Sequence, residues 1–177
     1  GYGVDILPSN SDMDFFDIDI LTDKKRFPSP FTVLKDKLGT LAASYDYVLI
    51  DTPPTLGFLT LNALVASDMV LIPIQTQFFA LMGLSMILDL LELIKTDLGY
   101  DIKKRYLLTI FDPRTKMAKE IVAQVKESLG EDVFKTVIPN NIRLAEAPSY
   151  GLPISIHAPD SPGALAYSNL AKEVMAL

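Results

Sequence analysis

Hydrophobic residues along the chain fall into two alternating patterns. Short apolar runs, of the kind that form buried strands, cover residues 4–8, 47–50, 69–74, 106–111 and 135–138. Apolar residues recur instead at helical spacing over residues 31–44, 59–66, 80–98, 115–129 and 162–176. The alternation of strand and helix predicts an α/β fold with a three-layer, doubly wound, mostly parallel sheet, in a single domain over residues 1–177.

The apolar run over residues 47–50 ends at Asp51, and Pro53 and Pro54 follow closely. Proline has no N–H for a sheet ladder and disfavours helix at the residue before it, so the chain must turn after Asp51. Ligands bind at the carboxyl ends of parallel strands, and a carboxylate there can hold Mg²⁺ through water. Asp51 is therefore a candidate metal ligand. The alternative is an acidic residue that caps the turn after a buried strand, and spacing alone does not separate the two.

Three other predicted strands also end in polar or proline-bearing segments, at residues 73–76, 112–115 and 139–143. In a parallel sheet these segments converge on one edge, which predicts a binding site there. A serine hydrolase is disfavoured, because the chain has no Gly-x-Ser-x-Gly motif and its one histidine, His157, is typical of a surface or loop residue.

The composition of the chain argues against several classes of protein. The 177 residues are 49% hydrophobic, but no apolar run reaches the roughly 20 residues of a membrane helix, so no membrane association is expected. The absence of cysteine excludes disulfides and thiolate metal sites, and a cytoplasmic location is the default. A net charge of −6 argues against an open nucleic-acid-binding surface, although it leaves room for a local basic patch.

Residues 45–57 read Tyr-Asp-Tyr-Val-Leu-Ile-Asp-Thr-Pro-Pro-Thr-Leu-Gly. This segment resembles the Walker B and switch II region of ParA-type partition ATPases, which have a P-loop NTPase-like fold. The resemblance continues, in order and at matching spacing, through Phe-Asp at 111–112, Ile-Pro at 138–139, Asn-Ile-Arg-Leu at 141–144 and Glu-Ala-Pro-Ser at 146–149. It covers nearly everything from residue 45 to residue 177 and is closest to the chromosomal ParA/Soj branch.

The resemblance implies an ATPase that forms a nucleotide-dependent homodimer around ATP and Mg²⁺. Such an ATPase binds DNA nonspecifically at the nucleoid and is stimulated by a ParB-type centromere-binding protein during partition of chromosome or plasmid DNA. By this resemblance Asp51 is the metal-binding carboxylate, and catalytic switch II comprises Asp51, Thr52, Pro53 and Pro54. The residues implied on the adenine side are Phe111, Asp112, Pro139 and Asn141, and those implied in DNA contact are Arg114 and Arg143. Without the resemblance, the two arginines would be interpreted as solvent-exposed charged side chains in loops.

The chain also departs from the family pattern. The Walker A loop, K-G-G-x-G-K-T, and the aspartate-bearing switch I are absent from these residues. We therefore expect the C-terminal portion of a ParA-type ATPase domain, with the N-terminal part missing, that is an ATPase when full length and inactive alone. Asn140 stands where the family often has a basic residue, which weakens the expected DNA contact. Two alternatives on the same scaffold are a MinD-like membrane-cycling regulator of cell division and a nucleotide-inactive interaction domain.

Overall fold

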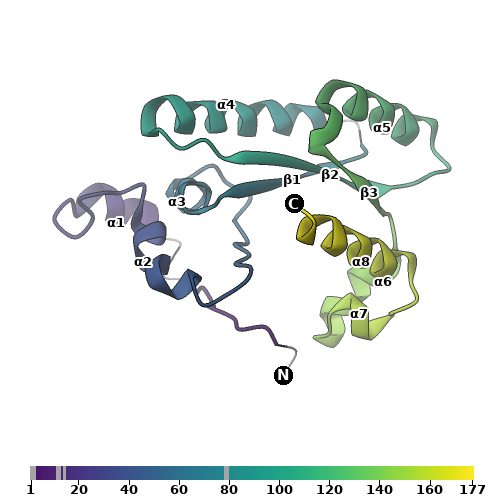
Figure 1. Cartoon of the computed structure of the whole chain (residues 1–177), viewed down its shortest axis with the longest axis horizontal. Coiled ribbons are helices and arrows are strands. Elements are labelled where there is room, and N and C mark those ends of the chain that lie inside the picture. Colours follow the sequence, from purple (N-terminus) through teal and green to yellow (C-terminus); the bar gives the residue numbers. More distant parts are fainter. Residues whose placement is uncertain (1–2, 11–12, 14, 78–79) are drawn as a thin grey trace. The chain divides into compact units, whose positions relative to one another are not determined.

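The chain forms two compact units, Gly1–Asp68 and Met69–Leu177. The computed structural model describes residues 3–10, 13, 15–77 and 80–177, without the side chains of residues 80–82 (Figure 1). The sequence also predicts a strand-to-helix loop over residues 75–79, and two of its residues, Phe78 and Phe79, lie outside this description. The single domain predicted over residues 1–177 stays a prediction.

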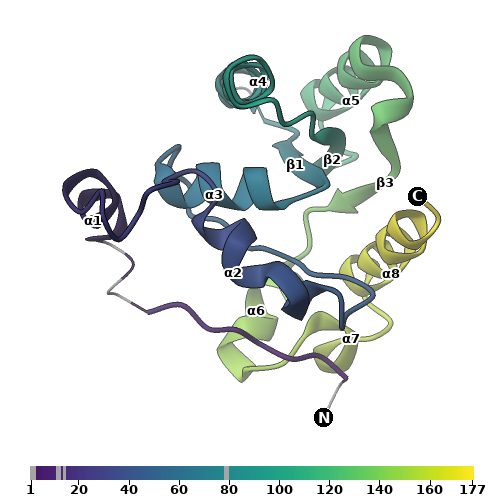
Figure 2. The ribbon, with the colours of Figure 1, turned by 60° about the vertical axis from the view of Figure 1, so that its left-hand side comes forward.

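The second unit contains a three-stranded parallel sheet in the order β1-β2-β3. Its strands are β1 (Met69–Gln75), β2 (Lys103–Phe111) and β3 (Val133–Pro139). Helices cover both faces of the sheet: α4 (Ala80–Leu98) and α5 (Lys116–Leu129) lie on one face and α8 (Pro162–Met175) lies on the other (Figures 1 and 2). The three-layer parallel α/β class predicted from the sequence is confirmed.

One buried cluster of this unit lies between the sheet and α8. Its buried members are Leu107, Phe134, Ile138 and Leu170, and the partly buried side chains around them are Leu71, Leu144, Ala166 and Val174. Helix α8 is fixed at its start by Ser161, whose Oγ accepts a hydrogen bond from the Ala164 N–H at 3.2 Å, and by Pro162 at the first helical position. Ser161 is therefore the N-cap of α8.

Shorter helical turns connect the main elements of the second unit. They are η2 (Gly130–Asp132), α6 (Ile142–Glu146), η3 (Ala147–Tyr150) and α7 (Ile154–His157). The longest described helix, α4, has 19 residues, and neither it nor another described helix has the apolar stretch that a bilayer span needs.

The α-helices of the first unit, in the part that the structure describes, are α1 (Phe16–Thr22), α2 (Val33–Ala42) and α3 (Phe58–Ala66). Asn62, buried on α3, joins this helix to the start of α2. Its Nδ2 donates to the Pro30 carbonyl at 2.9 Å and its Oδ1 accepts from the Leu34 N–H at 3.2 Å. Asp17 of α1 caps α3, because its Oδ1 accepts from the Phe58 N–H at 3.1 Å. Polar contacts therefore connect these helices, together with the stacked rings of Phe31 and Phe58.

Two predicted strands, residues 4–8 and residues 47–50, are wrong. Both segments are irregular and exposed, and the Leu49 side chain is 92% exposed. A strand exists only where a neighbour completes its ladder of hydrogen bonds, and no described residue pairs with either segment. A side-chain hydrogen bond links residues 4–8 to the residues just before 47–50, from the Tyr45 hydroxyl to Asp5 Oδ2 at 2.9 Å. The apolar pattern identifies segments that could join a sheet, but it does not show whether a neighbouring strand is present to pair with them.

The ladder between β2 and β3 is interrupted by bulges. The pairs Tyr106–Val133 and Leu108–Val137 flank one of them, so β2 advances from 106 to 108 while β3 advances from 133 to 137. Extra residues in a bulge lose their ladder partners. Here the N–H groups of Lys135 and Thr136 each donate to the Glu173 carboxylate of α8 at 2.8 Å, and the Thr136 hydroxyl donates to it as well. Glu173 thus fastens α8 to the irregular part of β3.

We expect the change Glu173→Gln to lower the free energy of unfolding by about 1–3 kcal/mol, since hydrogen bonds to a charged carboxylate are replaced by bonds to a neutral amide and one backbone N–H then faces its NH₂ group. Burial alone raises the pKa of the Glu173 carboxyl, but hydrogen bonds from Thr136 and Lys135 bring it below its ordinary value of 4.5. A lowered folded-state pKa means that the stabilisation is complete above 4.5 and is lost as the pH falls through the folded value.

The measurement is urea unfolding of wild type and Glu173→Gln at several pH values. The matched control is Glu127→Gln on α5, an exposed side chain without a hydrogen bond or ion pair to other described residues. The difference between wild type and Glu173→Gln should shrink as the pH falls below 4.5. A difference that is constant with pH, or equal to that of the control, would contradict the role given to this carboxylate.

Candidate functional site

The carboxyl ends of the three strands form one edge of the sheet in the second unit. Phe111 at the end of β2 is in register with Pro139 at the end of β3, and the Phe111 carbonyl accepts from the Asn140 N–H at 2.9 Å. Asp112 follows Phe111 directly and Asn141 follows Asn140. The four residues predicted on the adenine side, Phe111, Asp112, Pro139 and Asn141, therefore lie at this one edge, and each is half-buried.

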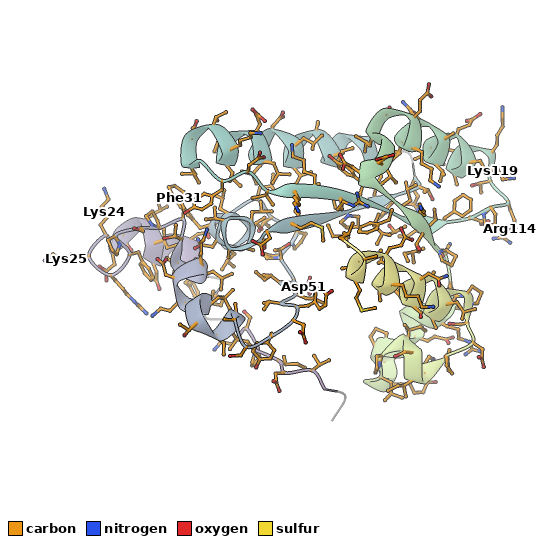
Figure 3. All side chains as sticks on the ribbon, viewed as in Figure 1. Lys24, Lys25, Phe31, Asp51, Arg114 and Lys119 are labelled. Atoms are coloured by element: carbon orange, nitrogen blue, oxygen red, sulfur yellow. The ribbon has the colours of Figure 1, made fainter. Side chains whose placement is uncertain are left out.

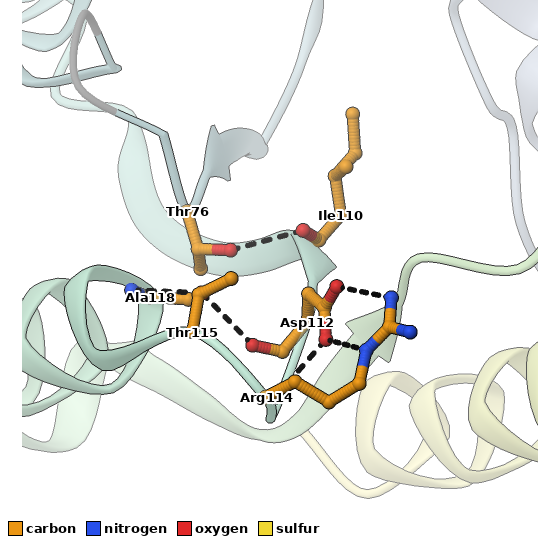
Figure 4. Close-up of polar contacts among 6 residues, drawn as sticks. All are labelled: Thr76, Ile110, Asp112, Arg114, Thr115 and Ala118. Atoms are coloured by element: carbon orange, nitrogen blue, oxygen red, sulfur yellow. Dashed lines mark hydrogen bonds and ion pairs between the residues drawn. The ribbon is translucent and has the colours of Figure 1, made fainter.

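A second bulge shapes this edge just before Phe111. Ile110 has a φ of 54°, a left-handed conformation that is strained for a β-branched residue. It lies where β2 advances from 108 to 111 while β3 advances from 137 to 139. Thr76, buried at the end of β1 with 2% exposure, donates from Oγ1 to the Ile110 carbonyl at 3.0 Å (Figure 4). The hydroxyl of Thr76 therefore satisfies a carbonyl at the strained residue.

The loop after β2 is organised by Asp112. Its carboxylate accepts two hydrogen bonds from the Arg114 guanidinium, at 2.9 Å from Nε and 2.7 Å from Nη2, and a third from the Arg114 N–H at 3.0 Å (Figure 4). The Asp112 carbonyl accepts from the Thr115 hydroxyl at 3.1 Å, and Thr115 caps α5 through the Ala118 N–H. The hydrogen bonds from Arg114 lower the pKa of the Asp112 carboxyl to about 2. Asp112 is therefore ionised at neutral pH and already has a cationic partner.

The loop after β3 has a parallel arrangement. Asn141 Oδ1 caps α6 by accepting from the Arg143 N–H at 3.1 Å, whereas its Nδ2 donates to no other described residue. Arg143 Nη1 donates to Glu146 Oε2 at 2.9 Å within the same helix. The guanidinium remains accessible from solvent, since the Arg143 side chain is 56% exposed. Each predicted DNA-contacting arginine thus has a carboxylate partner within three residues.

His157 does not lie in a loop at the surface, so that prediction is wrong. It ends helix α7, its side chain is only 13% exposed, and its ring stacks on Tyr150 with centroids 4.7 Å apart. Its Nε2 is buried without a hydrogen-bond partner among the described residues, 3.8 Å from Glu146 Oε2. The aromatic contact explains the burial, because a flat ring packs against another at little steric cost.

The predicted switch II residues belong to the first unit. Asp51, Thr52, Pro53 and Pro54 are exposed and lie in irregular backbone. The Asp51 carboxylate has no hydrogen bond or ion pair to another described residue (Figure 3). Within the described part of the chain, no three His, Cys, Asp or Glu side chains gather as a ready metal site. Asp51 is therefore a free carboxylate that offers one protein ligand.

Sequence reasoning missed Thr76, Ile110 and Glu146 as participants at these loops. Thr76 was visible only as one polar residue after a strand, and its role depends on a bulge that leaves no periodic signal. Glu146 had a signal that could have identified it, because an acidic residue three positions after Arg143 on a helix is a standard ion-pair spacing.

The chain is similar to known proteins in sequence. A family model described as an AAA domain matches residues 2–104, more than half of the chain. The sporulation initiation inhibitor protein Soj of Bacillus subtilis is 47% identical over 144 residues, which are 81% of this chain and 57% of Soj. The chromosome partitioning protein ParA of Myxococcus xanthus is 40% identical over 172 residues, 96% of this chain and 59% of that protein.

This chain belongs to the ParA/Soj family of partitioning ATPases. The ParA/Soj-type chain spans a little over half the length of the two relatives above. Among solved structures, it is similar to cobyrinic acid a,c-diamide synthase from Mycobacterium smegmatis, crystallised with an ATP analog and magnesium. That likeness has a TM-score of 0.78 and 27% identity, and it covers 96% of this chain and 61% of the synthase.

Two further likenesses of the ParA/Soj-type chain are to proteins below 25% identity and concern the fold alone. A plasmid partition protein of Borrelia burgdorferi bound to AMPPNP has a TM-score of 0.72 at 24% identity, covering 96% of this chain and 63% of that one. The septum site-determining protein MinD of Pyrococcus horikoshii, in complex with Mg-ADP, has a TM-score of 0.60 at 22% identity, covering 82% and 56%. The parallel sheet with flanking helices is common to both.

Proposed function

We propose that the intact protein partitions chromosome or plasmid DNA through ATP-driven dimerisation and hydrolysis. The observation that carries the proposal is the 40–47% identity to proteins named Soj and ParA. Supporting it, the residues expected on the adenine side share one sheet edge. The family relationship makes ATP hydrolysis the expected activity of the intact protein, whereas the present chain lacks the phosphate-binding loop expected from the family.

The residues present suit ATP and Mg²⁺ in their chemistry. Asp51 is a free carboxylate, and Mg²⁺ in nucleotide sites takes one or two protein carboxylates and keeps several waters. Bound magnesium would neutralise charge that develops on the phosphates. At the sheet edge, Phe111 and Pro139 offer apolar surface to a purine. The Oδ1 of Asn141 already accepts a hydrogen bond, which leaves the Nδ2 donors for acceptor atoms of the base.

DNA contact is proposed at the two loop arginines. The Arg114 side chain is 86% exposed (Figure 3). The Arg143 side chain is 56% exposed, so both guanidinium groups are accessible to a phosphate backbone. Arginine binds phosphate through two parallel hydrogen bonds without reading base sequence, which suits nonspecific retention on the nucleoid. We expect the intact protein in the cytoplasm, in association with the nucleoid. Because the net charge is −6, DNA can bind only at a local basic patch. The affinity of such a patch for DNA falls as the salt concentration rises.

Two protein partners complete the proposal. One is a second copy of the intact protein, which forms a homodimer with ATP bound. The other is a ParB-type centromere-binding protein that accelerates hydrolysis. Both come from the relationship to Soj and ParA, and neither depends on a particular described contact.

The test is sedimentation of the intact protein with ATP, with ADP and without nucleotide, each with and without duplex DNA. We expect ATP with Mg²⁺ to shift the monomer to a dimer, and DNA to co-sediment with that dimer at low salt. Sedimentation that is unchanged by nucleotide would contradict ATP-driven dimerisation. Dimerisation without retention of DNA would contradict the DNA-binding part alone.

A further inference from the structure

Both arginines proposed to contact DNA are restrained by carboxylates of their own loops. Asp112 binds the Arg114 guanidinium with both oxygens, at 2.9 Å and 2.7 Å, and also accepts from the Arg114 backbone N–H. In this pair the Asp112 side chain is 23% exposed and the Arg114 side chain is 86% exposed. The acid therefore lies nearer the protein, and the guanidinium lies over it toward solvent.

Glu146 contacts Arg143 from one turn along α6 through a single hydrogen bond. Its Oε2 accepts from Arg143 Nη1 at 2.9 Å and lies 3.8 Å from the buried Nε2 of His157. The stacking of His157 on Tyr150 fixes the imidazole beside this carboxylate. Glu146 therefore lies between the Arg143 guanidinium and the His157 ring.

A carboxylate and a phosphate bind a guanidinium through the same fork of two N–H donors. An arginine that forms two hydrogen bonds to an aspartate cannot present those donors to DNA at the same time. A phosphate that binds through these same donors must displace the carboxylate, and the nearby acid repels the DNA backbone whichever donors the phosphate uses. The low pKa of Asp112, about 2, means that its carboxylate does not become neutral at physiological pH.

We propose that Asp112 and Glu146 are restraining residues that compete with DNA phosphates for Arg114 and Arg143 and so weaken DNA retention. The inference rests on the proposed DNA contact of the two arginines. It assigns Glu146 a function that the resemblance does not, and it gives Asp112 a second role beside its proposed place at the nucleotide edge. Because Asp112 lies at that edge, a nucleotide that draws its carboxylate away from Arg114 would release the arginine for DNA.

The test begins with Glu146→Gln in the intact protein, because Glu146 is not among the residues proposed to bind nucleotide. Affinity for a 60-base-pair duplex of random sequence is measured with ATP over a salt series. An exposed ion pair of this kind is weak, so we expect a gain of about twofold to fivefold in affinity for Glu146→Gln. We also expect a salt slope steeper by up to about 0.9, the value of one added phosphate contact.

Asp112→Asn is the second variant, with its nucleotide affinity measured separately. The matched controls are Glu127→Gln and Asp160→Asn, which make the same charge change at exposed acids without an ion pair to a described residue. A stricter control repeats each restraining change after its arginine is removed, as in Arg143→Ala with Glu146→Gln. The gain should then fall to that of the control acids, because pairwise coupling requires both partners.

A gain that persists without the arginine, or that equals the gain of the control acids, would overturn the inference and leave general charge repulsion as the cause. Failure of the proposed DNA contact gives a different result. In that case, reversing the charge of both arginines leaves DNA retention unchanged. If charge reversal weakens retention but Glu146→Gln and Asp112→Asn match their controls, only the restraint is wrong.

Discussion

Replacing Asp51 with alanine should abolish Mg²⁺-dependent ATP hydrolysis by the intact protein. The Asp51 carboxylate is free of hydrogen bonds and ion pairs to other described residues, so nothing in the described fold depends on its charge. Its proposed role is to bind Mg²⁺ through the water molecules around the ion. The ion would in turn neutralise the charge of the phosphates. We expect turnover to fall at least about 100-fold, the scale on which loss of one electrostatic stabiliser acts in catalysis. Phosphate release with and without Mg²⁺ measures the effect.

Asp46→Ala is the matched control for this prediction. Asp46 is an exposed aspartate in the same segment, also without a hydrogen bond or ion pair to a described residue. The control should keep wild-type turnover and Mg²⁺ dependence, and both variants should unfold at the same urea concentration as wild type. Normal Mg²⁺-dependent turnover by Asp51→Ala would show that another group holds the metal. Equal loss in both variants would point to damage of the segment rather than to a metal site.

Reversing both loop arginines, in Arg114→Glu with Arg143→Glu, should strongly reduce retention of duplex DNA at low salt. Each change removes one arginine–phosphate interaction and adds a repelling charge. Because two such interactions are removed together, we expect the slope of log affinity against log salt to fall by about 2. Filter retention or electrophoretic shift over a salt series measures both the affinity and the slope.

Lys24→Glu with Lys25→Glu makes the same charge change at two neighbouring lysines of the first unit. In the described structure these lysines make no ion pair with a carboxylate. Retention should fall less in this control, and the two variants should differ in salt slope. Unchanged retention in the arginine variant would show that DNA contact lies elsewhere. An equal fall in both would indicate that net charge, rather than the two loops, controls DNA binding.

The second unit was predictable from the sequence because its signals are local and agree with one another. The unbroken apolar run over residues 69–74 suited a strand covered on both faces, and β1 pairs there with β2 in parallel. The amphipathic stretch that follows Thr115 predicted a helix through Leu129, and α5 covers Lys116–Leu129. At such positions residue type, spacing and tertiary packing favour the same structure.

The segment over residues 47–50 was not predictable in the same way. Its apolar character describes what a strand needs, while strand formation depends on a neighbour elsewhere in the sequence. Leu49 is therefore exposed despite a sequence context typical of a core. The irregular edge of the sheet escaped prediction for a related reason. The left-handed Ile110 and the hydroxyl of Thr76 meet across two strands, and neither residue type marks a bulge.

The candidate site was predicted in its location more than in its contacts. Convergence of the strand ends at one edge followed from parallel topology, and Phe111 and Pro139 lie there in register. The partners of Arg114 and Arg143 were not predicted, because the resemblance assigned these side chains to DNA and said nothing of nearby acids. The functional roles of all these residues stay predictions until the variants are measured.

Glu173 also bears on the solubility of the protein. Its carboxylate occupies the two backbone N–H groups that the bulge in β3 exposes, at the outer strand of the described sheet. Free N–H groups on an outer strand are a template to which a strand of another molecule can add. Acidification that protonates Glu173, or its replacement, would uncover that template. Aggregation below the ordinary carboxyl pKa of 4.5 would then begin at β3 by intermolecular strand pairing rather than by general unfolding.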